Sequence, residues 1–99
     1  MSQWQVAGKL GQARQGDVLL VEIDRSALPT KGLSARSVVV AEGEATGHKH
    51  RFADESAVAV YDAPDGHMYA EVNADTELVH EEHGAIPFSR GTILQIRRQ

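Results

Sequence analysis

The sequence is divided into short apolar segments, and turn-forming residues separate each segment from the next. The segments are rich in β-branched residues or alternate apolar with polar residues, and they span 17–24, 38–41, 48–52, 57–61, 68–72, 76–80 and 92–97. Glycine, proline and an Asp-Gly step lie between them, and no stretch carries a sustained apolar repeat of 3.6 residues. This spacing is typical of sandwiches and small barrels. We therefore expect an all-β fold, a small single-domain barrel or sandwich of about seven short antiparallel strands.

The length of the chain limits it to one domain. It has 99 residues, of which 41% are hydrophobic, and domains usually have about 100–150 residues. We expect an N-terminal arm or lead-in over residues 1–13 and a single β domain over residues 14–99. A chain of this size buries about two-thirds of its unfolded surface, which leaves a thin core. Because small cores are often supplemented by a metal or by oligomerisation, we expect a homo-oligomer, with a dimer as the default.

The chain contains no cysteine. A disulfide framework, a thiolate zinc site and an iron–sulfur cluster are therefore all excluded. No apolar run approaches the roughly 20 residues that span a bilayer, and residues 1–5 lack the apolar core of a signal peptide. These features predict a cytoplasmic protein without membrane contacts.

Charge is distributed unevenly along the chain, whose formal net charge is −4. The stretch 54–89 has no lysine or arginine but holds nine acidic residues, namely Asp54, Glu55, Asp62, Asp65, Glu71, Asp75, Glu77, Glu81 and Glu82. A field of this sign disfavours nucleic-acid binding, in which phosphate contacts dominate the affinity. Two interpretations stay open: a solvated acidic surface, or an acidic face that attracts cations or a basic protein partner.

Four of the five histidines form two pairs, His48-x-His50 and His80-x-x-His83. Residues two apart on a strand point to the same side, so His48 and His50 are expected to present their imidazoles together. His80 ends a predicted strand and converges with His83 if the chain curls there. Imidazoles arranged in this way suit a first-row metal ion, with zinc as the first choice. The predicted ligands are His48, His50, His80 and His83, and Glu55, Glu81 or Glu82 can add a carboxylate.

The histidine pairs are also compatible with roles that need no metal. They can be surface residues paired with acidic neighbours, or a metal-free catalytic or pH-sensing cluster. Four ligands close a tetrahedral site and three leave room for water, so the pattern alone does not separate a structural from a catalytic metal. Candidate bases are Glu44, Glu55, Glu81 and Glu82, and Thr46-Gly47 is a candidate oxyanion contact. We expect His67, in a turn, to be exposed.

Motifs of other catalytic classes do not occur in the chain. It has no Gly-x-Ser-x-Gly elbow, no phosphate-binding Gly-Lys-Ser/Thr loop and no dinucleotide fingerprint. The leading hypothesis is thus a metal-binding protein; metal-assisted hydrolysis or a cupin-like reaction is compatible with such a site, but the sequence does not identify a reaction. The alternative is a non-catalytic interaction or assembly module in which the acidic stretch recruits a partner.

Two resemblances rest on these residues. Gly43-x4-His48-x-His50-x4-Glu55 resembles the first metal motif of the cupins, which implies a cupin-like metal site with Glu55 beside the two histidines. In the second cupin motif a histidine follows a Pro-x-Gly turn, whereas His80 and His83 here precede Pro87 and Gly91.

Most of the chain also resembles a family of small uncharacterised bacterial and phage proteins. The resemblance is carried by 15–19, by Glu42-Gly43-Glu44-x-Thr46-Gly47-His48-x-His50, by His80-Glu81-Glu82-His83 and by 96–99. It implies that the two histidine pairs belong to one family pattern, and it implies no activity.

Overall fold

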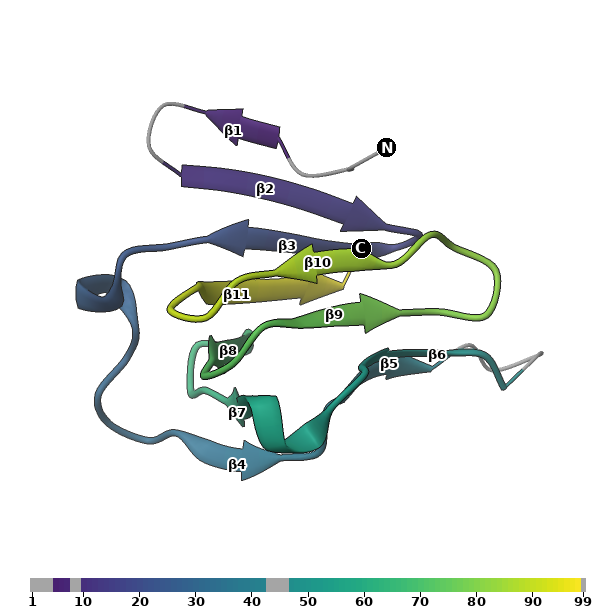
Figure 1. Cartoon of the computed structure of the whole chain (residues 1–99). Coiled ribbons are helices and arrows are strands. Elements are labelled where there is room, and N and C mark those ends of the chain that lie inside the picture. Colours follow the sequence, from purple (N-terminus) through teal and green to yellow (C-terminus); the bar gives the residue numbers. More distant parts are fainter. Residues whose placement is uncertain (1–4, 8–9, 43–46, 99) are drawn as a thin grey trace.

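The computed structural model describes residues 5–7, 10–42 and 47–98. These residues form two antiparallel sheets that pack face to face as an open β-sandwich (Figure 1). The larger sheet has seven strands in the order β1(Gln5–Ala7), β2(Leu10–Gln15), β3(Val18–Glu22), β11(Ile93–Arg98), β8(Met68–Val72), β7(Val58–Asp62) and β4(Ser34–Arg36). The smaller has four, in the order β10(Ile86–Phe88), β9(Thr76–Val79), β6(Lys49–Phe52) and β5(Val39–Glu42). Two 3-10 turns, η1(Arg25–Ala27) and η2(Glu55–Ala57), complete the described elements.

The all-β prediction is confirmed, and the sandwich alternative is the one that holds. The two sheets are not joined into a closed barrel within the described parts of the chain. The described residues form eleven strands, where about seven were expected. The additional strands are short pieces with weak sequence signals. For example, β10 contains Pro87, which is tolerated there because β10 is an edge strand.

The expected lead-in over residues 1–13 contains strand structure. Gln5–Ala7 forms β1 and Leu10–Gln15 forms β2, which pairs with β3, so the expected boundary at residue 13 falls within a strand. Residues 11–15 of β2 do alternate between buried and exposed positions. The alternation cannot be recognised from the hydrophobicity of the sequence, because the buried positions hold Gly11, Ala13 and Gln15 rather than large apolar residues.

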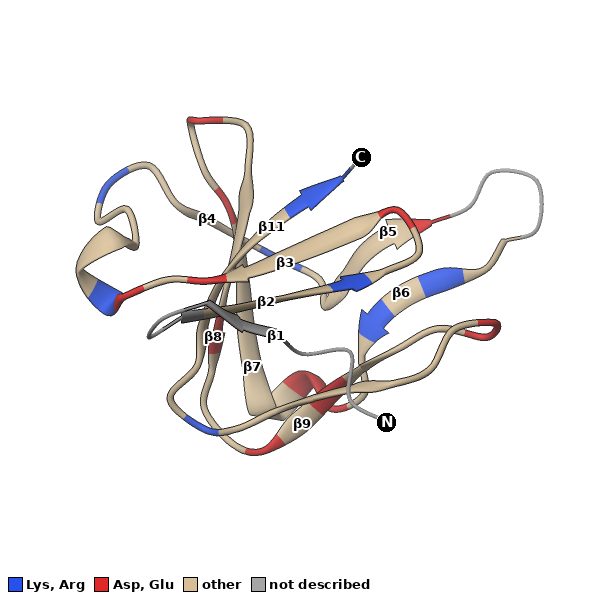
Figure 2. Cartoon of the chain, turned by 90° about the horizontal axis from the view of Figure 1, so that it is seen from above, with Lys and Arg blue, Asp and Glu red and all other residues tan. Residues whose placement is uncertain are grey.

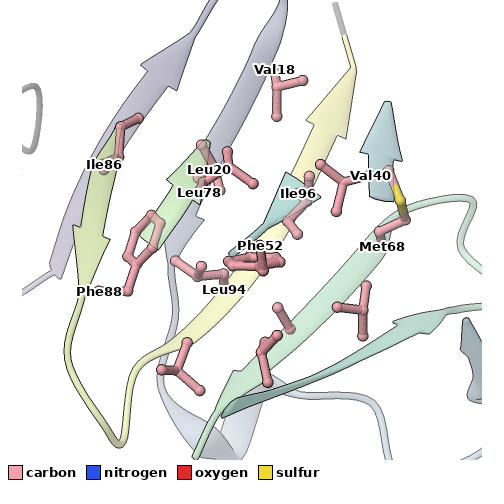
Figure 3. Close-up of a cluster of buried hydrophobic side chains, with 14 of the residues drawn as sticks. Val18, Leu20, Val40, Phe52, Met68, Leu78, Ile86, Phe88, Leu94 and Ile96 are labelled. Atoms are coloured by element: carbon pink, nitrogen blue, oxygen red, sulfur yellow. The ribbon is translucent and has the colours of Figure 1, made fainter. Parts of the chain in front are cut away.

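The core lies between the two sheets (Figure 3). Strands β3 and β11 contribute alternate side chains from the larger sheet, such as Leu20 and Leu94, both fully buried. Phe52 of β6 and Leu78 of β9 meet them from the smaller sheet. In β6 the inward positions are His50 and Phe52. The alternation of the strand thus carries a histidine to the end of the apolar core.

The acidic stretch 54–89 does not gather on one face. Its carboxylates lie in turns, in η2 and in the strands β7, β8 and β9, and the red segments of Figure 2 are distributed around the molecule. Some of them pair with basic residues from the first part of the chain. Arg25 contacts Glu71 at 2.8 Å and Arg36 contacts Asp62 at 3.0 Å. The excess of negative charge is therefore a feature of the sequence segment rather than of a single surface.

Among the described residues, no helix is long and apolar enough to cross a membrane.

Candidate metal centre

The two histidine pairs meet at one end of the sandwich. The β2–β3 turn and the β9–β10 loop lie at this end (Figure 1), and His48 and His50 enter it from the start of β6. Strand β6 pairs with β9 so that Arg51 lies opposite Val79. When this antiparallel register is extended by one residue, His50 lies opposite His80. The two rings are accordingly in contact, with their centroids 4.2 Å apart.

The His80 ring lies at the centre of the cluster. Its centroid is 5.6 Å from that of His48 and 4.6 Å from that of His83, in addition to the His50 contact. The rings of His50 and His83 are stacked at 5.9 Å. All four predicted ligands are therefore brought together, from two positions about thirty residues apart in the sequence.

His50 is the buried member of the cluster, with 4% of its surface exposed. Its Nδ1 atom lies 2.9 Å from Oε1 of Gln15, which is itself completely buried. The Gln15 amide nitrogen donates to the carbonyls of Leu78 and Gly84, at 3.0 and 2.9 Å. Because carbonyls only accept, these bonds fix the amide orientation, so Oε1 accepts and His50 Nδ1 donates. A neutral His50 then has its free lone pair on Nε2.

His48 has a similar arrangement through a carboxylate. Its Nδ1 atom lies 2.9 Å from Oε1 of Glu82, the residue that faces it when the β6–β9 register is extended. A carboxylate accepts only, so His48 Nδ1 carries a proton, and in the neutral form of the ring the lone pair is on Nε2. Metal-ligating histidines typically donate their second ring N–H to an oxygen acceptor in this manner. Both histidines of the first pair thus hold Nε2 ready to accept a cation.

His80 and Glu81 complete a set of ligand atoms with His48. One ligand atom from each of the three residues lies within 4.8 Å of the others. The His80 ring is also part of a local turn, because its Nδ1 accepts a hydrogen bond from the backbone N–H of Glu82 at 3.0 Å. With Nδ1 accepting, a neutral His80 carries its proton on Nε2. Ligation by His80 therefore requires the 81–82 turn to release this bond.

Charged groups around the rings favour a cation. A pocket of about 190 Å³ is lined by Asp17, Ala41, Glu42, His48, His50, His80, Glu82 and His83. Glu81 lies beside it, and its carboxylate accepts from the backbone N–H of Lys49 at 3.0 Å. Four carboxylates therefore surround four imidazoles, and the nearest ammonium, that of Lys49, is 3.8 Å from Glu42. The pocket has room for an ion together with several water molecules, each of which takes about 30 Å³.

Burial is the largest influence on the protonation of His50. It lowers the pKa of this ring below its usual value, and the neighbouring His80 and His83 lower it further, while Asp17 acts in the opposite direction. The pKa of Glu81 is also lowered, first by the hydrogen bond from the Lys49 amide. The neutral imidazole and the ionised carboxylate are the forms that bind metals.

Gly16 lies directly against the rings of His83 and His50. It has a positive φ of 58° in the turn between β2 and β3. A Cβ atom at this position would lie 2.8 Å from Nε2 of His83 and 3.3 Å from Cε1 of His50. Only glycine lets the two rings approach the turn this closely.

Not every predicted residue is at this site. Glu55, which the cupin resemblance implies, lies in η2 and lines a different pocket that contains none of the histidines, so that part of the resemblance is wrong. His67 is half-buried in the β7–β8 turn rather than exposed. Gly43, Glu44 and Thr46 lie outside the described residues.

Sequence reasoning missed the groups that support the histidines. Gln15, Asp17 and Glu42 were not predicted as site residues, and only the family resemblance at 15–19 and 42–50 included them. A glutamine in a polar segment gives no indication in the sequence that it is buried. The role of Gln15 depends on its hydrogen bonds to the carbonyls of residues 78 and 84, which are distant in the sequence.

Residues 14–99 match the family described as Domain of unknown function (DUF8820). The chain belongs to this family. The DUF8820 match begins within β2 and includes Gln15, Asp17 and all five histidines. It confirms the expected membership of an uncharacterised family, and the histidine pattern as a family signature remains a prediction. No curated protein and no solved structure matches the chain.

Proposed function

We propose that this protein binds a divalent transition-metal ion at the histidine end of the sandwich, through His48, His50, His80 and His83, with zinc as the first choice. The observation that carries the proposal is the hydrogen bonding of the first pair. His48 and His50 each place Nδ1 on an oxygen acceptor, Glu82 and Gln15 respectively. Both rings are thereby oriented with Nε2 as the accepting nitrogen, as metal-binding imidazoles require.

The spacing of the rings also supports binding. A zinc–nitrogen distance of 2.0–2.1 Å with tetrahedral angles places the centroids of two ligating imidazoles about 5 Å apart. The observed centroid separations of 4.2 to 5.9 Å lie on either side of this value. Binding therefore needs small ring movements rather than a rearrangement of strands.

The space around the rings favours an open site. The pocket of about 190 Å³ between the side chains exceeds what one ion needs, and His83 and Glu82 are exposed. We propose that water enters the coordination sphere and that the metal assists hydrolysis, because a bound zinc ion lowers the pKa of water to about 7. Glu82 lines this pocket and Glu81 lies beside it, so either carboxylate can accept a proton there.

Metal content measured on protein purified without a histidine tag tests the proposal. We expect about one or more equivalents of zinc per chain after reconstitution and dialysis, and a raised melting temperature with zinc. The double variant His48→Ala/His50→Ala should lose both effects. His67→Ala removes a histidine outside the cluster and should retain them. Less than about 0.2 equivalents in the wild type, unchanged in the double variant, contradicts metal binding.

An assembly function is the second candidate, and the open sheet edges favour it. In the described chain, β1 and β4 end the larger sheet and β5 and β10 end the smaller one. Exposed edges are templates for pairing with another strand. We propose a homodimer formed through such an edge. Light scattering should then show a mass that rises from monomer to dimer with concentration and is insensitive to a chelator, while a constant monomer mass contradicts it.

A further inference from the structure

A groove of about 720 Å³ is lined by residues of β5 and by one residue each from β4, β8 and β11. Its volume lies within the range of small-molecule sites, which is roughly 300–1,000 Å³. Val40 of β5 and Met68 of β8, which belong to the buried cluster, form part of the lining (Figure 3). The groove therefore offers an apolar surface to a small molecule.

Two arginines line the groove, and they differ in what they already contact. Arg36 forms an ion pair with Asp62 at 3.0 Å, and its Nη2 atom donates to the carbonyl of Val39 at 2.8 Å. These contacts hold Arg36 in place and offset its charge. Arg98 is exposed, and it has no carboxylate partner among the residues that the structure describes. Its guanidinium is therefore available to an anion.

The alternation of β11 explains why Arg98 lies at the groove. Leu94 and Ile96 point into the core, and Arg98 follows two residues later on the same face of the strand. Ile96 pairs with Met68, so Arg98 lies just beyond this apolar contact. Arg97, on the opposite face, does not line the groove. At the end of the core, a guanidinium thus takes the next inward position of the strand.

The groove and the histidine pocket meet at the end of β5, because Ala41 and Glu42 line both of them. The charges of the two linings differ. Among the described residues, the histidine pocket is lined by the carboxylates of Asp17, Glu42 and Glu82 and by no lysine or arginine, whereas the groove has two arginines and one carboxylate. An elongated molecule with one anionic end therefore has a preferred direction, with that end at Arg98 and the other toward the histidines.

We propose that Arg98 binds the anionic group of a small organic molecule, a carboxylate or a phosphate, whose apolar part lies on Val40 and Met68. Hydrogen bonds from a guanidinium to such groups are charge-assisted and often bidentate, so Arg98 supplies both affinity and orientation.

The position of the groove also names a substrate class for the histidine end, an assignment that rests on the proposed metal-assisted hydrolysis. The substrate is an ester or amide that carries a separate anionic group, and its scissile bond lies at the end away from Arg98. Hydrolysis adds water across the acyl C–O or C–N bond and yields a carboxylic acid together with an alcohol or an amine.

Binding without metal tests the groove independently of the proposed function. Chelator-treated, isotope-labelled protein is titrated with phenylbutyrate, with phenylpropyl phosphate and with the uncharged phenylbutyramide, and the amide resonances are followed by NMR. At least one anion should bind about tenfold or more tightly than the amide and shift the resonances of Val40, Met68 and Arg98. The tighter of the two anions identifies carboxylate or phosphate as the group recognised.

A pair of arginine variants provides the matched control. Arg98→Gln should lose the preference for the anion, whereas Arg97→Gln, which removes the neighbouring charge on the opposite face, should retain it. Equal binding of the amide and both anions, or a preference that survives Arg98→Gln, overturns the proposal. Groove resonances that shift with protein concentration instead of with the probe also overturn it, because they indicate that a second copy of the chain occupies the groove.

The orientation is tested with Co²⁺, a paramagnetic substitute for zinc that speeds the relaxation of nearby protons. In Co²⁺-loaded protein, the phenyl protons of phenylbutyrate should relax faster than the methylene protons beside its carboxylate. The reverse order overturns the substrate class and leaves the groove as an anion site. A protein that binds no Co²⁺ overturns the proposed function and the substrate class with it, whereas anion binding to the metal-free protein still supports the groove.

Discussion

The two halves of the histidine cluster are held in place by different means. The strand half consists of Gln15, Gly16, Asp17 and His50, which lie on or between β2, β3 and β6. Its histidine is almost completely buried, and its hydrogen bonds link three separate segments of the chain. The loop half consists of His48 and 80–83. Its members are half-buried or exposed, and they are held by one hydrogen bond within the 80–82 turn and by the contact of His48 with Glu82.

This difference predicts different roles for the two halves in the proposed metal binding. The positions of the strand half follow from sheet register, so in the proposed metal site its side chains are already in place without an ion and are costly to move. The loop half would have to shift if it binds the proposed ion, since His80 must then give up its bond from the Glu82 amide. Four substitutions or conditions test this division, from the largest expected effect to the smallest.

The largest effect is expected at Gln15. Gln15→Leu keeps the volume but leaves the carbonyls of Leu78 and Gly84 and the Nδ1 of His50 without partners. We expect the free energy of unfolding to fall by about 3 kcal/mol and the metal affinity by about 100-fold. Chemical denaturation and calorimetric zinc titration measure the two quantities. Gln12→Leu on the exposed face of the same strand is the control, and equal effects in both variants contradict a special role for Gln15.

A smaller loss is expected at Gly16. Gly16→Ala imposes a backbone cost of roughly 1–2 kcal/mol for a left-handed conformation, and its Cβ also meets His83 and His50. Gly66→Ala is the matched control, because Gly66 has a φ of 87° but nothing within 4 Å of an added Cβ. The melting temperature should fall in both variants, whereas zinc affinity should fall at least about tenfold only in Gly16→Ala. An unchanged zinc affinity in Gly16→Ala would show that zinc binding does not need the close approach of the His50 and His83 rings to the β2–β3 turn.

A loop-half change should have a milder effect. Glu82→Gln weakens the acceptor on His48 Nδ1 while keeping its size. Zinc affinity should fall by about tenfold, the lower end of what supporting hydrogen bonds contribute, with little change in stability because the side chain is exposed. Glu55→Gln, at the carboxylate implied by the cupin resemblance, should bind zinc as the wild type does. A loss of zinc affinity as large as that of Gln15→Leu would show that the two halves contribute equally to binding.

The smallest effect is a difference in pH dependence without metal. The folded state holds the pKa of His50 below its ordinary value of 6.5, so the unfolded state binds more protons between the folded pKa and 6.5. This contribution to stability is complete above pH 6.5 and is lost as the pH falls toward the folded pKa. With a chelator present, the melting temperature should fall more between about pH 7.5 and 5.5 in the wild type than in His50→Leu. His67→Leu should retain the wild-type slope, and identical slopes in all three proteins contradict the assignment.

The sequence predicted which histidines lie together better than it predicted the residues around them. Alternation along a strand was sufficient to place His48 and His50 on one side, and the burial of His50 and Phe52 on the same face of β6 agrees with it. The register between β6 and β9 was not predictable, because the sequence does not indicate that Arg51 pairs with Val79. That one pairing decides which loop residues face the first histidine pair.

Large apolar strands were predicted well, and strands built from small or polar residues were missed. Residues 68–72 form β8 with the bounds that the alternation indicates. In contrast, β2 buries a glycine, an alanine and a glutamine, whose contribution comes from close packing and hydrogen bonding to distant segments. Three-residue strands such as β4 and β10 exist because a neighbouring strand offers pairing, which is a tertiary effect.

The position of β11 has a consequence for how this protein is made. Residues 93–98 pair with β3 on one side and β8 on the other, so the centre of the larger sheet is its last strand in chain order. During translation the β2–β3 hairpin and the β7–β8 hairpin emerge well before the strand that joins them. Such non-local pairing slows folding and leaves unpaired edges exposed in the meantime. A chain released by a ribosome that stalls before residue 93 would therefore have two separate hairpins, β2–β3 and β7–β8, with unpaired edges that are prone to aggregation.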